Sequence, residues 1–144
     1  MVLPERDPCP FCENVAGRRE CAVIARAGVA LAFVNPRQYE TGASLVVPER
    51  HVTTIMELDD QEASDMMKLA VRVARAMEAA FSPAGLNLIQ NNGVTAGQSV
   101  PHAHIHVIPR YGTEPVPEEI ATHPIAPFDD RLKVAERIRQ RLLP

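Results

Sequence analysis

The longest periodic stretch of the sequence covers residues 58–81 and stands between short apolar runs. Apolar residues recur in it at steps of three and four positions: Ala63, Met66, Met67, Ala70, Val73, Ala74, Met77 and Phe81. This spacing predicts an amphipathic helix that buries one face. Asp59 and Glu62 predict a capping box at its start, and Ser82-Pro83 predicts its end.

Short apolar runs on both sides of this helix predict strands. They cover residues 21–26, 29–34 and 43–48 before the helix, and 86–90 and 102–108 after it. The connections between the first three runs are too short for crossovers, which favours antiparallel pairing. We therefore predict an α+β fold in which a five-stranded, mainly antiparallel sheet packs on the central helix.

The C-terminal part has a different character. Residues 109–127 contain five prolines and no periodicity, which predicts an extended arm, and Asp130–Leu142 predicts a last helix. We expect the fifth strand to lose its regularity at Pro109. A chain of 144 residues has the size of one domain. We expect residues 1–144 to form one, with a core over about 9–112 and a C-terminal arm and helix over 113–144.

Composition and charge narrow the class of protein. Hydrophobic residues make up 46% and charged residues 23% of the chain, as in globular proteins. A net charge of −3 without a long basic run disfavours a nucleic-acid partner. No apolar run approaches the roughly 20 residues that span a bilayer, and the first residues carry charges where a signal peptide is apolar. We therefore expect a cytoplasmic protein with no membrane partner.

Three histidines alternate in the run HAHIHVI, residues 102–108. On a strand, His102, His104 and His106 share one face, with neighbours about 6.6 Å apart and the outer pair about 13 Å apart. One zinc ion at about 2 Å from each nitrogen cannot be held by all three. Because the chain has only five histidines, we disfavour chance clustering on an exposed edge. A neutral imidazole can act as a nucleophile while its neighbours donate protons, so we expect phosphate chemistry.

The residues just before the histidines support this expectation. Gly97, Gln98 and Ser99 supply a flexible backbone, an amide and a hydroxyl. These groups are donors that a phosphoryl group can use.

Cys9 and Cys12 form a CPFC motif that suits either a redox pair or a metal site. A redox pair needs a core strand directly before the first cysteine, and residues 1–8 do not read as one. Zinc is therefore the preferred interpretation. Two thiolates leave two positions of a tetrahedral site open, and His51 and His102 are the candidates to fill them.

The HAHIHVI run resembles the motif of the histidine triad (HIT) superfamily of nucleotide hydrolases and transferases. Three further segments are similar to family segments in the family's order: CPFC, AFVNPRQYETGASLVVPERH and NNGVTAGQSVPHAHIHVIPR. The resemblance covers roughly residues 9–112. It implies a HIT-like fold.

The resemblance also implies roles for the three histidines. His104 would attack the α-phosphorus of a nucleotide and form a covalent nucleotidyl-histidine that water then cleaves. His106 would bind the α-phosphate and the bridging oxygen, and His102 would support the group.

Other positions acquire roles from the same resemblance. Gln98 and Ser99 match positions that contact phosphate oxygens or the leaving group, Asn35 matches a ribose-binding position, and Asn91 and Gly93 match the loop on the phosphate side. The family commonly carries Pro-Gly-His before its third strand, whereas this chain has Thr41-Gly42-Ala43. That departure weakens any inference about groups behind the triad.

The resemblance further implies a zinc site of two cysteines and two histidines: Cys9, Cys12, His51 and His102. It also implies a homodimer, to which Met66, Ala70 and Met77 are candidate contributors, with the arm after residue 110 reaching the partner's site.

The predicted function is nucleoside phosphoramidase or nucleotide hydrolase activity on a purine nucleotide, with AMP-like products. An alternative within the enzyme class is hydrolysis of dinucleoside polyphosphates, such as diadenosine tri- or tetraphosphate. An alternative from another class is a non-catalytic nucleotide-binding or scaffold module.

Overall fold

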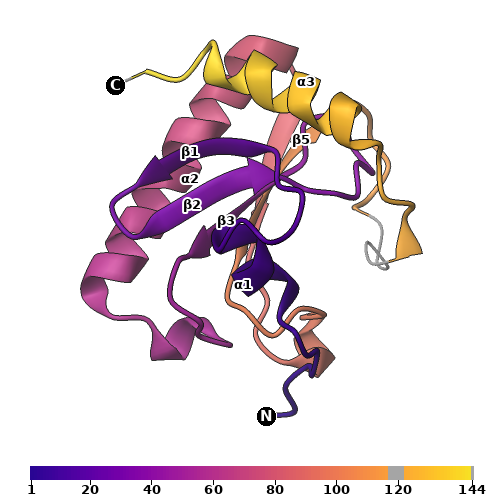
Figure 1. Cartoon of the computed structure of the whole chain (residues 1–144). Coiled ribbons are helices and arrows are strands. Elements are labelled where there is room, and N and C mark those ends of the chain that lie inside the picture. Colours follow the sequence, from indigo (N-terminus) through magenta and orange to yellow (C-terminus); the bar gives the residue numbers. More distant parts are fainter. Residues whose placement is uncertain (117–121, 144) are drawn as a thin grey trace.

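The fold is known from a computed structural model that describes residues 1–116 and 122–143. Its centre is a five-stranded sheet in the order β1-β2-β3-β5-β4, in which every pair is antiparallel (Figure 1). The strands are β1 (Val23–Ala27), β2 (Ala30–Val34), β3 (Ser44–Pro48), β4 (Gly85–Ile89) and β5 (Ile105–Arg110). The predicted α+β fold with a five-stranded antiparallel sheet is confirmed.

Three helices accompany the sheet: α1 (Pro10–Val15), α2 (Asp60–Phe81) and α3 (Phe128–Arg139). Two short 3₁₀ turns, η1 (Ile55–Glu57) and η2 (Val94–Ala96), lie in loops. The predicted capping box of α2 is present: Asp59 Oδ1 accepts from the Glu62 N–H at 2.7 Å, and Glu62 Oε2 accepts from the Asp59 N–H at 2.9 Å. Ser82 ends the helix in the left-handed conformation.

The two faces of the sheet are covered differently. Helices α2 and α3 pack on one face, where Ile105 and Val107 of β5 join the larger apolar cluster. The other face carries Phe33 of β2 and Leu45 of β3 in a smaller cluster with Phe11 of α1. Because α1 is short, this second face is left partly open for a site.

The structure corrects several sequence-based boundaries. Strand β5 begins at Ile105 rather than at residue 102, so His102 and His104 lie in the segment before it. It also continues through Pro109 to Arg110, against our expectation. The pairing of β5 with β3 ends at Val107, so the missing N–H of Pro109 interrupts no bond to β3.

Helix α1 was not predicted because six residues are too few to show a helical period. Helix α3 begins at Phe128 and ends at Arg139, not at Asp130 and Leu142. Part of the predicted arm, residues 117–121, lies outside the described residues. The assignment of residues 1–144 to one domain stays a prediction.

One expectation about α2 was wrong. Met66, Ala70 and Met77, which we considered for a dimer interface, are buried against the sheet of their own chain with at most 1% exposure. They belong to the core because they occupy the stripe that faces the strands. Among the described residues, no helix has the length and apolar character needed to cross a bilayer.

Candidate active site

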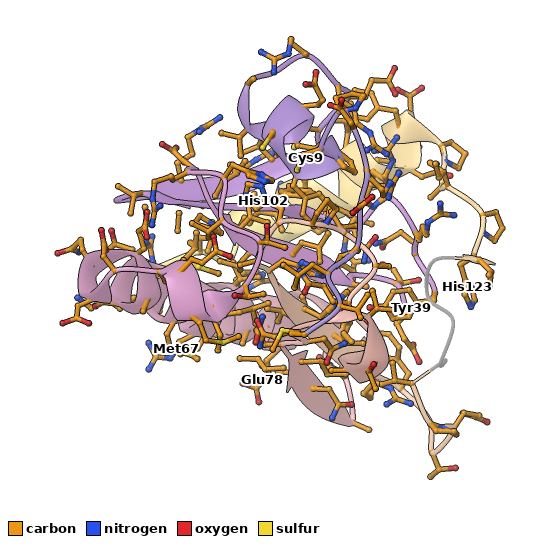
Figure 2. All side chains as sticks on the ribbon, turned by 90° about the horizontal axis from the view of Figure 1, so that it is seen from below. Cys9, Tyr39, Met67, Glu78, His102 and His123 are labelled. Atoms are coloured by element: carbon orange, nitrogen blue, oxygen red, sulfur yellow. The ribbon has the colours of Figure 1, made fainter. Side chains whose placement is uncertain are left out.

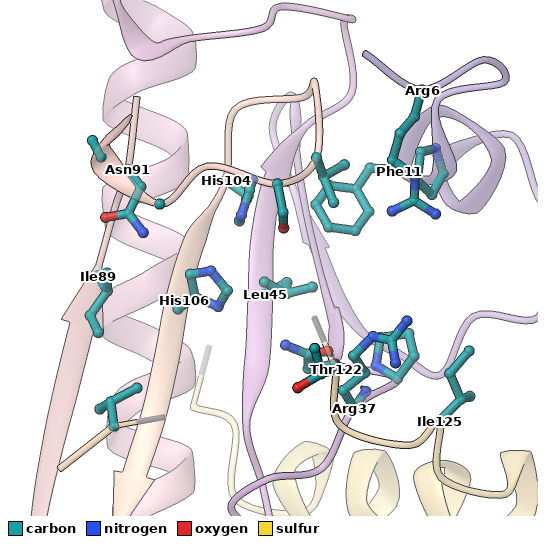
Figure 3. Close-up of a pocket in the computed structure, with 18 of the residues that line it drawn as sticks. Arg6, Phe11, Arg37, Leu45, Ile89, Asn91, His104, His106, Thr122 and Ile125 are labelled. Atoms are coloured by element: carbon teal, nitrogen blue, oxygen red, sulfur yellow. Dashed lines mark hydrogen bonds between the residues drawn. The ribbon is translucent and has the colours of Figure 1, made fainter. Parts of the chain in front are cut away.

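A cavity of about 670 Å³ opens on the sheet face opposite α2 (Figure 3). His104 and His106 line it from the segment that enters β5 and from β5 itself, and Leu45 lines it from β3. Its size is in the range of pockets that hold small ligands, about 300–1,000 Å³. The two histidines make this cavity the candidate active site.

The His104 ring is held in one orientation by a single hydrogen bond. Its Nδ1 lies 2.7 Å from the backbone carbonyl oxygen of His102, and only a protonated Nδ1 can donate to that oxygen. Burial lowers the pKa of His104, so the ring is neutral near pH 7. A neutral ring with its proton on Nδ1 carries a lone pair on Nε2. That nitrogen is therefore free to attack an electrophile.

His106 stacks edge-on against His104, with ring centroids 4.9 Å apart. Burial and the neighbouring His104 lower its pKa to about 3, which keeps this ring neutral as well. Its Nδ1 is buried and has no hydrogen-bond partner among the described residues. A neutral imidazole in this position can donate one hydrogen bond to a phosphate oxygen.

His102 is fully buried, does not line the cavity, and belongs to a cluster with both predicted cysteines. Figure 2 shows it close to Cys9. Its Nε2 donates to the backbone carbonyl oxygen of Pro48 at 2.8 Å, which leaves Nδ1 unprotonated. That Nδ1 lies 3.5 Å from the sulfur of Cys9 and 3.5 Å from the sulfur of Cys12.

His51 completes the cluster, with its Nδ1 3.1 Å from the Cys12 sulfur. The four ligand atoms of Cys9, Cys12, His51 and His102 lie within 4.8 Å of one another. Zinc with sulfur at about 2.3 Å and nitrogen at about 2.0 Å in a tetrahedron brings such ligands to about 3.5 Å from each other. The predicted ligand set therefore has the spacing of a tetrahedral metal site.

The electrostatics of the two thiols also suit a cation. Burial, the hydrogen bond with Cys9 and the charge of Cys9 raise the pKa of Cys12 to about 11. Two neighbouring thiolates are thus unfavourable by themselves. A metal ion removes that penalty by displacing the protons.

The predicted nucleotide-binding residues fall into two groups. Asn35, Asn91 and Ser99 line the cavity. Gln98 is buried beside it, and its side chain holds the loop together: its carbonyl oxygen accepts from the Gly93 N–H at 2.7 Å, and its amide donates to the carbonyl of Thr53 at 2.6 Å. Contact of Gln98 with a phosphate needs these bonds to break, and Gly93 contributes no lining surface.

The Thr41-Gly42-Ala43 turn has a steric explanation. Gly42 has φ +103°, and a Cβ there would lie 3.2 Å from both Phe81 and Pro109. Ala43 is fully buried beside it. The turn is therefore closed by packing, without a histidine behind the triad.

Several residues of the cavity were not predicted. Phe11, between the two cysteines in sequence, packs edge-on against His104 at 5.1 Å between ring centroids. Arg6, Arg19 and Arg37 line the cavity from loops. Loop residues show no periodicity, so only the position of Phe11 inside the CPFC motif offered a signal. Thr122 and Ile125 of the arm line this chain's own cavity, whereas we had expected the arm to reach a partner's site.

The fold and the site define an antiparallel α+β protein with a histidine-lined cavity and an adjoining Cys/His cluster. A family model described as "HIT domain" matches residues 17–113, more than half of the chain. The chain belongs to the HIT family.

Curated relatives agree with this assignment. The chain is 40% identical over 104 residues to "Protein hit" of Bacillus subtilis, with 72% of each chain covered. It is 35% identical over 106 residues to "Adenosine 5'-monophosphoramidase hnt1" of Schizosaccharomyces pombe, covering 74% of this chain and 77% of the relative. It is 38% identical over 88 residues to the asymmetrical bis(5'-nucleosyl)-tetraphosphatase of the same yeast, covering 61% and 48%.

Solved structures share the fold. A HIT-like protein of Bartonella henselae superposes with a TM-score of 0.86 at 24% identity, covering 96% of this chain and 99% of that one. A zinc-bound histidine triad family protein of Mycobacterium smegmatis superposes with a TM-score of 0.77 at 24% identity, covering 93% and 92%.

Proposed function

We propose that this protein is a nucleotide hydrolase that acts on the α-phosphate of a purine nucleotide through a covalent intermediate on His104. One observation carries the proposal. The 2.7 Å bond between His104 Nδ1 and the His102 carbonyl places the proton on Nδ1 and leaves the Nε2 lone pair for the cavity. A protein that only binds nucleotides has no need of a nucleophile held in this way.

The reaction has two displacements at phosphorus. His104 Nε2 attacks the α-phosphorus, an N–P bond forms, and the bond to the leaving group breaks. The exposed Ser99 hydroxyl at the cavity wall is placed to donate a hydrogen bond to the leaving group. The leaving group takes up one proton from solvent as it departs. Water then attacks the same phosphorus and releases one proton, the N–P bond breaks, and a nucleoside monophosphate leaves with the imidazole restored.

Other side chains bind and orient the nucleotide. His106 donates to a non-bridging oxygen of the α-phosphate from a ring that stays neutral. Asn35 and Asn91 lie at the cavity wall for the ribose and the phosphate side. Gln98 acts as a positioning residue that holds the loop from Gly93 to Val100.

The relatives support both enzymatic alternatives. One S. pombe relative is named as an AMP phosphoramidase and another as a dinucleoside tetraphosphatase. The phosphoramidase match covers more of both chains, so we place phosphoramidate hydrolysis first. Hydrolysis of dinucleoside polyphosphates is the second candidate.

We also propose that Cys9, Cys12, His51 and His102 hold a structural zinc ion. The proposal rests on the spacing of the four ligand atoms and on their sulfur and nitrogen donors, which zinc prefers. When bound, the metal ties α1 to the segment that precedes β5. All four ligands are then used, so no position remains for substrate.

We propose that a homodimer forms through a surface that does not include the buried residues Met66, Ala70 and Met77. Strand β4 is an edge strand, and exposed apolar side chains surround it and α2, among them Ile55, Met67 and Leu88. Met67 lies on the outward side of α2 (Figure 2). An apolar edge of this kind is usually covered by a partner.

The direct test is chemical. The protein is incubated with adenosine phosphoramidate, lysyl-AMP, diadenosine triphosphate and diadenosine tetraphosphate, and AMP release is measured. We expect His104→Asn to lower kcat about 10³-fold or more because it removes the nucleophile. Intact-mass spectrometry after rapid acid quench should show an adenylylated wild-type chain and none in the variant.

The matched control is His123→Asn, a histidine whose ring does not line the cavity. It should retain wild-type turnover. Unchanged turnover in His104→Asn would retire the hydrolase proposal.

A further inference from the structure

The cavity carries positive charge on a wall remote from the histidines. Arg6 comes from the start of the chain, Arg19 from the connection between α1 and β1, and Arg37 from the loop after β2. Figure 3 shows Arg6 and Arg37 across the cavity from His106. A guanidinium stays protonated throughout the physiological pH range. This wall, which we name the arginine wall, therefore holds three charges.

The arginine wall lacks matching carboxylates in the described parts of the chain. None of the ion pairs formed by residues 1–116 and 122–143 includes one of its three arginines. Among residues 1–116 and 122–143, the one side-chain hydrogen bond of these three arginines runs from the Arg37 guanidinium to the backbone carbonyl of His123. With respect to the described residues, most of the fifteen N–H donors of the three guanidiniums thus remain for other acceptors.

The environment of Arg19 is electrostatically unfavourable for its positive charge. Arg19 is half-buried, and burial together with the charges of Arg6, Arg131 and Arg37 lowers its pKa. Arg131 is itself paired with Glu20 at 3.7 Å, whereas Arg19 has no ion-pair partner within the described parts of the chain. Desolvated like charges are unfavourable unless an opposite charge joins them. An anionic ligand supplies that charge.

The chemistry of the arginine wall selects a phosphoryl group. The guanidinium fork matches phosphate oxygens in pairs, and a phosphate monoester carries about −1.5 to −2 charges on three oxygens at pH 7. Phe11 and Leu45, which also line the cavity, offer apolar surface for a nucleoside. The cavity thus has two ends for phosphate and an apolar part for the rest of the ligand.

We infer that the arginine wall is a second phosphoryl subsite, so that the preferred substrate carries a phosphoryl group there in addition to the one at His104. The inference rests on the proposed function, which places the α-phosphate at the histidines. The extra group has two possible sources. It is either the continuation of a 5'-polyphosphate chain or a phosphate on the ribose.

Equilibrium binding tests the inference without requiring turnover. AMP, ADP and adenosine 3',5'-bisphosphate are titrated into the full-length protein by calorimetry. ADP extends the 5' chain, and the bisphosphate adds a ribose phosphate, so the two ligands distinguish the sources. We expect one of them to bind at least about tenfold more tightly than AMP, since hydrogen bonds to charged groups are worth about 1.5–3 kcal/mol.

Variants test whether the tighter binding relative to AMP depends on the arginine wall. Arg19→Gln and Arg37→Gln should each reduce the affinity ratio over AMP about tenfold. Arg19→Lys keeps the charge without the fork and should retain part of the ratio. The matched control is Arg75→Gln, an exposed arginine on α2 across the sheet, which should keep the full ratio.

The outcomes separate the two proposals. The subsite is wrong, and the proposed function stands, if AMP binds but neither ADP nor the bisphosphate binds more tightly. The same holds if the gain in affinity survives in both Arg19→Gln and Arg37→Gln. If AMP itself does not bind, the proposed function fails and this inference fails with it.

Discussion

At the scale of single residues, His102 links two sites. Its side chain lies in the Cys/His cluster, and its backbone carbonyl accepts a hydrogen bond from Nδ1 of His104, the proposed nucleophile. Its other ring nitrogen is tied to the carbonyl of Pro48. His102 therefore connects the cluster with the His104 ring through one hydrogen bond.

Removal of a cluster ligand should affect both sites. We expect Cys12→Ser to lower zinc content well below one ion per chain, and to lower kcat roughly tenfold or more because the support behind the nucleophile loosens. Metal analysis and steady-state kinetics measure the two effects. Cys21→Ser, at a cysteine outside the cluster, should keep both values. Full zinc occupancy in Cys12→Ser would contradict the ligand assignment.

Gly42 gives a second prediction at this scale. Gly42→Ala should cost about 1–3 kcal/mol of unfolding free energy, because the residue has φ +103° and its Cβ would meet Phe81 and Pro109 at 3.2 Å. Urea unfolding measures the change. The control is Gly85→Ala, where nothing lies within 4 Å of the added Cβ. Equal effects at the two positions would show that the strain is not local.

At the scale of elements, the start of α2 combines a cap with an ion pair. Glu62 accepts from the Asp59 N–H and from two nitrogens of Arg50, at 2.7 and 2.8 Å. The Arg50 guanidinium, followed by the Asp59 N–H, lowers the pKa of Glu62 to about 2. This carboxylate therefore stabilises the fold above its ordinary pKa of about 4.5.

The lowered pKa of Glu62 gives a prediction about stability and pH. Stability from Glu62 is lost as the pH falls from about 4.5 toward 2, because the unfolded chain takes up the proton first. Glu62→Gln should lower Tm by a few degrees at pH 7, and the difference from wild type should shrink over this window. Thermal unfolding followed by circular dichroism tests it.

Asp60→Asn changes an exposed carboxylate two positions before Glu62 and serves as the control. It should show no such narrowing with pH. A Glu62→Gln difference that is independent of pH would mean that side-chain shape, not charge, matters at this cap.

At the scale of the whole molecule, the two faces of the sheet have different roles. The α2 and α3 side supplies the larger core, and the open side holds the cavity. The edge at β4 leaves apolar side chains exposed near α2, including Met67 at 51% and Leu88 at 43%. This edge, which adjoins the α2 face, is the candidate dimer surface.

A charge placed on that edge should prevent association. We expect Met67→Glu to convert a dimer to a monomer, because an exposed apolar side chain at an interface becomes a buried charge. Light scattering coupled to size-exclusion chromatography measures the mass. Lys68→Glu, a neighbouring exposed residue outside the apolar patch, is the control. A monomeric wild-type protein would remove the dimer proposal.

Local signals in the sequence were sufficient to predict the five strands and the helices α2 and α3, but not the six-residue helix α1. The period of α2, its capping box and the short apolar runs all reflect burial of one face and satisfaction of backbone groups, which act over a few residues. The histidine run and the CPFC motif likewise carried their chemistry in residue type and spacing. Residue type and spacing were therefore sufficient to identify Cys9, Cys12, His51 and His102 as candidate ligands.

Only the tertiary structure decided how these parts meet. It placed His102 in the cluster and directed its carbonyl to His104, occupied Gln98 within its own loop, and buried Met66, Ala70 and Met77. It also gathered Arg6, Arg19 and Arg37 from three loops onto one wall. Contacts between residues far apart in the chain depend on packing and leave no periodic trace in the sequence.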